Sequence, residues 1–103
     1  MFDITKHIGK PAVLEQCAEE CAELAQVCLK AARKLRDENP TPMTWDEIVQ
    51  KLNEEAADVT LCMNVMVGAD LLSYEAIDSE YTIKEERWKT RIEEKENNDI
   101  KGE

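Results

Sequence analysis

The sequence LEQCAEECAELAQVCLKAARKL, residues 14–35, decides the fold class of this chain of 103 residues. Apolar side chains recur in it every three or four residues, which is the spacing of an amphipathic α-helix. The stretch contains neither proline nor glycine, so nothing in it breaks a helix. We expect an apolar stripe with heptad-like spacing at Leu14, Cys17, Cys21, Leu24, Cys28, Ala31 and Leu35.

Capping signals on both sides of this stretch predict where helices begin and end. Asp3 is expected to cap a short helix that ends near Gly9, and Pro11 suits the first turn of the long helix. That helix is expected to reach about Asp37, because two prolines within residues 38–43 indicate a loop. Thr44, with Glu47 three residues later, forms the capping box of a second long helix.

The second long helix is expected to reach about Val67 and to stop at Gly68. A third is expected from about Leu72 to the mid-nineties, followed by a polar, frayed tail over residues 96–103. The second helix has an apolar stripe in which one acid takes a core position: Ile48, Leu52, Glu55, Val59, Cys62 and Met66.

These elements predict an all-α fold with a single domain over residues 1–95. Its architecture is an antiparallel helical bundle of three main helices plus a short N-terminal helix. A helix of about 26 residues is about 39 Å long, and three such helices in so short a chain leave apolar stripes uncovered. We therefore expect oligomerisation to complete the bundle, as a homodimer or a homotetramer.

Composition excludes several classes of partner. The chain has 13 basic and 23 acidic residues, a net charge of −10, which argues against nucleic acid and against anionic membrane surfaces as partners.

No apolar run approaches the roughly 18 residues of a membrane span, and the N-terminus lacks the apolar core of a secretory signal. The cysteines have helical spacing without metal-binding motifs, so we interpret all four as reduced core residues of a cytoplasmic protein.

Two pairs of acids stand out, because each pair is three residues apart and shares one helix face. They are Glu20 with Glu23, and Glu55 with Asp58. If the two helices pack antiparallel, all four carboxylates meet near mid-helix. A set of oxygen ligands without histidine favours Mg2+, with Mn2+ as a substitute. A solvated acidic face explains either pair taken alone; the two together favour a metal site.

The two motifs resemble the signature of the MazG-like all-α nucleoside triphosphate pyrophosphohydrolases. They read Glu19-Glu20-Cys21-Ala22-Glu23 and Glu55-Ala56-Ala57-Asp58, and the resemblance covers about residues 8 to 92. It implies hydrolysis of a nucleoside or deoxynucleoside triphosphate to the monophosphate and pyrophosphate. It further implies that the four acids hold Mg2+ and that Glu19 positions or deprotonates the attacking water.

A triphosphate beside four acids needs positive charge as well as metal. Lys84, Arg87 and Arg91 share one face of the third long helix and are candidates for binding it; a solvated face paired with nearby acids explains them equally well. Trp45, beside the loop, is a candidate for stacking on a base, although packing is the commoner role of tryptophan.

Two alternatives stay open at the level of sequence. A phosphoribosyl-ATP pyrophosphohydrolase is similar in fold and motif. A non-enzymatic helical module would bind a protein partner through its apolar stripes, need no metal, and direct Glu55 to solvent or to a basic partner.

Overall fold

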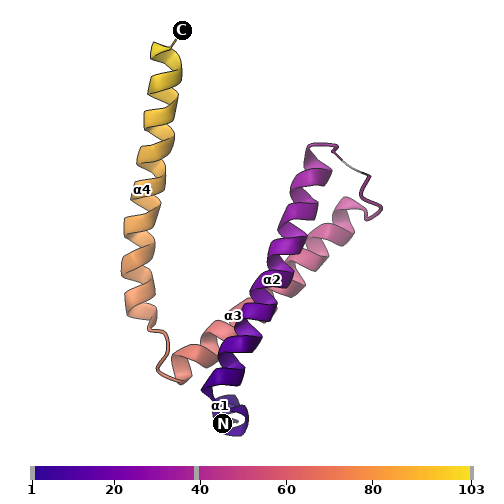
Figure 1. The fold of residues 1–103 in the computed structure, drawn as a ribbon, viewed down its shortest axis with the longest axis vertical. Helices are drawn as coiled ribbons and strands as arrows, with labels where there is room; N and C mark the ends of the chain where they lie inside the picture. Colours follow the sequence, from indigo (N-terminus) through magenta and orange to yellow (C-terminus); the bar gives the residue numbers. More distant parts are fainter. Residues whose placement is uncertain (1, 39, 103) are drawn as a thin grey trace. The chain divides into compact units, whose positions relative to one another are not determined.

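The computed structural model describes residues 2–38 and 40–102, and four α-helices account for most of them (Figure 1). The helices are α1 (Ile4–Ile8), α2 (Lys10–Leu35), α3 (Trp45–Gly68) and α4 (Tyr74–Lys101). The described residues contain no β-strand. The prediction of an all-α chain with a short N-terminal helix and three long helices is therefore confirmed.

Contacts divide the chain into two units, the first ending at Leu71 and the second beginning at Leu72. The first unit contains α1, α2 and α3, and its main packing is between α2 and α3, which run antiparallel as a helical hairpin (Figure 1). The second unit is α4. Oligomerisation, and with it the completed bundle, stays a prediction.

The core of the first unit lies along the seam between α2 and α3. Its buried apolar residues are Val13, Val27 and Ala31 from α2 and Ile48 from α3, with Ala69 just after α3. Ile48 and Val13 are the most deeply buried, at 1% and 2% exposure. The seam is narrow because only two long helices form it, so each of these side chains matters for stability.

The predicted stripe of α3 is confirmed along its whole length, since all six of its residues are buried or half-buried. The predicted stripe of α2 is only partly right. Leu14, Cys21, Cys28 and Leu35, which follow one another at intervals of seven, are exposed. The stripe that faces the seam consists instead of Val13, Cys17, Glu20, Leu24, Val27 and Ala31.

This correction has a physical reason. The apolar surface of α2 is wider than the strip that one partner helix can cover. The predicted heptad positions include the edge of this surface that α3 leaves uncovered. It also changes the interpretation of the cysteines. All four are free thiols, but only Cys17 and Cys62 are half-buried, so the expectation that all four lie in the core is wrong for Cys21 and Cys28.

Local hydrogen bonds fix the helix ends. The side chains of Asp3, Thr44 and Ser73 accept hydrogen bonds from the first turns of α1, α3 and α4, and Thr44 with Glu47 forms the predicted capping box. Both α2 and α3 end in a Schellman-type turn with an aspartate in the left-handed region, Asp37 at φ 55° and Asp70 at φ 60°. Asp70, not Gly68, therefore provides the left-handed turn after α3.

The far end of α4 differs from the prediction. The helix continues to Lys101 instead of stopping in the mid-nineties, because no proline or glycine interrupts the sequence before Gly102. Among the described residues, none of the helices combines the length and apolar composition needed to cross a membrane.

Candidate metal centre

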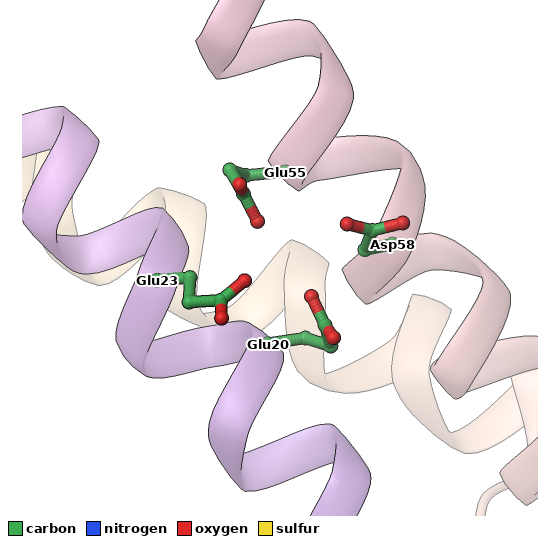
Figure 2. A group of neighbouring side chains, drawn as sticks. All are labelled: Glu20, Glu23, Glu55 and Asp58. Atoms are coloured by element: carbon green, nitrogen blue, oxygen red, sulfur yellow. The ribbon is translucent and has the colours of Figure 1, made fainter.

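The antiparallel pairing of α2 and α3 brings the two acidic motifs face to face at mid-helix. Figure 2 shows Glu23 opposite Glu55 and Glu20 opposite Asp58, with the carboxylates pointing into the space between the helices. The spacing of three residues is the same on both helices, so the two pairs lie at matching heights. The meeting of four carboxylates, expected from the sequence, is confirmed.

The four side chains are close enough to share one ion. Each offers a carboxylate oxygen, and these four oxygens lie within 4.8 Å of one another. Their burial is unequal: Glu55 is only 5% exposed and Glu20 is half-buried, whereas Glu23 and Asp58 are exposed. The group therefore has a buried floor, formed by Glu55 and Glu20, and an open rim, formed by Glu23 and Asp58, that solvent can reach.

Two carboxylate oxygens at this floor are buried without a hydrogen-bond donor. They are Oε2 of Glu20 and Oε2 of Glu55. The other oxygen of Glu20 accepts a hydrogen bond of 2.8 Å from Nε2 of Gln16. A buried, unpartnered carboxylate oxygen is costly, and a bound cation removes that cost. These two atoms distinguish the group from an ordinary acidic surface.

Glu20 contributes more to this site than its sequence position indicated. It occupies a seam position of α2, between Cys17 and Leu24, just as Glu55 occupies a seam position of α3. Each helix thus places one acid where the packing pattern calls for an apolar side chain. The reason that the sequence showed this only for Glu55 is the misplaced stripe on α2.

One basic residue beside the site was missed. Nζ of Lys51 lies 3.3 Å from Oε1 of Glu55 and 3.8 Å from Oε2 of Glu54. The signal was present in the sequence, because a lysine four residues before a glutamate shares its helix face. Lys51 supplies a single positive charge against four acids, so a strong excess of negative charge remains.

This excess of negative charge raises the proton affinity of the Glu23 carboxylate at the open rim. The pKa of Glu23 is raised above its ordinary value of 4.5, chiefly by hydrogen bonding with the Glu55 carboxylate and then by the negative charges of Glu20 and Glu55. A divalent cation would relieve the same repulsion, so proton and metal compete for these oxygens.

The raised pKa predicts how stability depends on pH when divalent cations are removed. The folded state holds the Glu23 proton more tightly than the unfolded state does. Protonation of Glu23 therefore contributes fully to the free energy of unfolding below pH 4.5, and this contribution is lost as the pH rises through the higher pKa of the folded state. In EDTA, we expect urea midpoints to fall as the pH rises above 4.5 and through the raised, folded-state pKa of Glu23. Glu23→Gln should flatten this dependence; a midpoint that rises over the same range would contradict it.

The donor set fits a hard divalent cation. Carboxylate oxygens are the ligands that Mg2+ and Mn2+ prefer, and the only histidine, His7, lies on α1 outside the group. Burial raises the pKa of the nearby Cys17 and Cys62 thiols, so they stay protonated and are poor ligands for a softer metal.

Other candidate residues lie outside the four-carboxylate group. Glu19 is exposed on α2, next to Glu20. Trp45 is 41% exposed and opens α3, about 15 Å along the helix axis from Glu55. Their roles stay predictions.

The candidate phosphate-binding cations are on α4, in the second unit. Lys84, Arg87 and Arg91 are exposed, and no ion pair is recorded for them in the described part of the chain. The ion pair within α4 joins Lys89 and Glu93 instead, at 4.0 Å. Pairing of these three cations with neighbouring acids, the alternative to phosphate binding, is not seen among the described residues. Contact between α4 and the carboxylates stays a prediction.

Comparison of this chain with protein-family models, with curated proteins and with solved structures gave no match.

Proposed function

We propose that this protein is a Mg2+-dependent nucleoside triphosphate pyrophosphohydrolase of the MazG-like type. The observation that carries the proposal is the group of four carboxylates with two buried oxygens that lack a donor. Such a group is suited to an ion that can in turn hold phosphate oxygens. The paired acidic motifs and their sequence context support the same assignment.

The five acids divide into three roles in the proposed reaction. Glu20 and Glu55 form the buried floor that holds Mg2+, and Glu23 and Asp58 complete its ligands at the open rim. The bound ion would neutralise triphosphate oxygens and lower the pKa of a bound water. Glu19 would orient or deprotonate the attacking water. Water adds at the α-phosphorus, and the oxygen that bridges to the β-phosphate leaves with pyrophosphate.

Positioning and charge stabilisation account for most of the catalysis of phosphoryl transfer, so residues that hold the triphosphate matter as much as the acids. We assign this task to Lys84, Arg87 and Arg91, and stacking on the base to Trp45. These residues come from α4 and from the far end of α3. A homodimer or homotetramer is the proposed active form, in which the apolar edge of α2 and the apolar residues of α4 are covered.

The test is a panel of ribo- and deoxyribonucleoside triphosphates, together with phosphoribosyl-ATP, incubated with the protein and Mg2+. Monophosphate and pyrophosphate should appear in equal amounts with at least one substrate, and EDTA should stop the reaction. A preference for phosphoribosyl-ATP would favour the biosynthetic alternative. Release of inorganic phosphate with a diphosphate product, or no turnover at all, would contradict the proposal.

A non-enzymatic interaction module is the second candidate, and the exposed apolar surface favours it. Large apolar side chains are strongly exposed on both units, among them Leu35 at 72%, Trp88 at 69% and Ile100 at 70%. Glu55 also has a basic partner in Lys51, as a module would require. A measurement of metal binding distinguishes the enzyme from the module. Only the enzyme requires the two buried, unpartnered carboxylate oxygens to hold a cation.

A further inference from the structure

Lys51 is the one basic residue that the described part of the chain places in an ion pair with any of the four carboxylates, and its partner among them is Glu55. Its ammonium contacts Glu55, whose side chain is 7% exposed, while its own side chain is 47% exposed. Lys51 therefore reaches from the solvent-facing rim to the floor of the site. It bonds Oε1 of Glu55 and leaves Oε2 unpartnered.

Acids on both helices act on the charge of Lys51. Its pKa is raised, first by the hydrogen bond with Glu55, then by the negative charges of Glu55 and Glu54, with a smaller contribution from Glu23 on the facing helix. One ammonium against four carboxylates leaves most of the negative charge uncompensated. A lysine also has only donors and no geometric demand, so it can balance charge without fixing the site in one arrangement.

Binding of a divalent cation to Glu55 would favour a different position of the Lys51 ammonium. Two positive charges that share one carboxylate repel each other, and this repulsion is strong where the surroundings are partly buried. The exposed, flexible stem of Lys51 can turn outward from the rim without disturbing the seam. At that rim, a triphosphate held by the metal would present negatively charged oxygens.

We propose that Lys51 is an exchangeable counterion of the metal site. It balances Glu55 in the protein without divalent cation, releases it when such a cation binds, and then pairs with a phosphate oxygen of the substrate. The last step rests on the proposed function, whereas the first two do not. The proposal gives Lys51 two opposed effects, competition with metal and attraction of substrate, which a merely structural lysine would not have.

The metal effect is tested by titrating Mn2+ into EDTA-treated, dialysed wild type and Lys51→Met. Removal of the competing ammonium should tighten Mn2+ binding, on the order of tenfold. Lys89→Met is the matched control, since Lys89 also pairs with a glutamate four residues later, but both side chains are more than half exposed. It should leave Mn2+ affinity unchanged. Unchanged or weaker binding in Lys51→Met would overturn the exchange.

The substrate effect is tested with a nonhydrolysable nucleoside triphosphate at saturating Mn2+. Lys51→Met should weaken its binding about tenfold or more, and Lys51→Arg should restore most of it because the positive charge returns. Equal affinity in wild type and Lys51→Met would overturn the phosphate contact. If wild type itself binds no triphosphate, the proposed function fails, while the Mn2+ titration still decides the counterion role. Lys51→Gln replaces Lys51→Met in both titrations if the latter does not fold.

Discussion

Replacing Glu55 with glutamine is expected to reduce pyrophosphohydrolase activity by at least about 100-fold, because it removes a metal ligand while keeping the shape of the side chain. Loss of groups that merely support metal ligands already costs roughly 10- to 100-fold. Asp58→Ala, at the exposed rim, should have a similar effect on turnover. Steady-state release of pyrophosphate at saturating Mg2+ measures both.

The fold should survive the Glu55 change, since glutamine fits the same space and one buried charge is removed. Glu54→Gln is the matched control: it is the same change one residue away, at a side chain that is 54% exposed and outside the group. It should retain nearly full activity. Equal activity of wild type and Glu55→Gln would exclude Glu55 as a ligand, and equal loss in Glu54→Gln would mean that overall charge alone is responsible.

Ile48→Ala is expected to destabilise the hairpin by about 2–5 kcal/mol, the usual cost of truncating a large buried aliphatic side chain. Ile48 is 1% exposed, and on α3 it lies seven residues before Glu55. The antiparallel register places it near Val27 and Ala31 on α2, the other buried residues at that end of the seam. So small a core has few other contacts to compensate for a cavity.

Urea unfolding followed by circular dichroism measures this loss. Ile100→Ala makes the same chemical change at a side chain that is 70% exposed in the single chain, and its effect should stay within about 0.5 kcal/mol at protein concentrations low enough to keep the chain monomeric. If Ile48→Ala were as mild as Ile100→Ala, the seam between α2 and α3 would not be the core of the first unit.

The sequence predicted the parts of the fold that local chemistry determines. Asp3 and Thr44 were identified as caps because their side-chain bonds span only three residues, and the stripe of α3 followed from its regular spacing. The stripe of α2 was misassigned because two apolar edges lie side by side there. Only the packing partner selects the edge that includes Val13 and Val27 over the one that includes Leu14 and Cys28. The end of α4 was missed because its polar last turns have no apolar period to follow.

The candidate site was predicted more fully than the core, because acids three residues apart on facing antiparallel helices leave few arrangements. Glu20, Glu23, Glu55 and Asp58 converge as expected. The unequal burial of the four could not be predicted, since it depends on which edge of α2 packs. Lys51 had a readable signal, its spacing from Glu55, but surface lysines with that spacing are common. The role proposed for α4 depends on the proposed assembly, whose contacts extend beyond one chain.

Every role proposed for this site requires that the four carboxylates bind a divalent cation. Calorimetric titration of Mn2+ into EDTA-treated, dialysed protein tests this, with Glu20→Gln and Asp58→Asn as variants, and with a nonhydrolysable triphosphate present in a second series. We expect saturable heat in wild type that is lost in both variants. No saturable heat in either series, or heat that both variants retain, would contradict it.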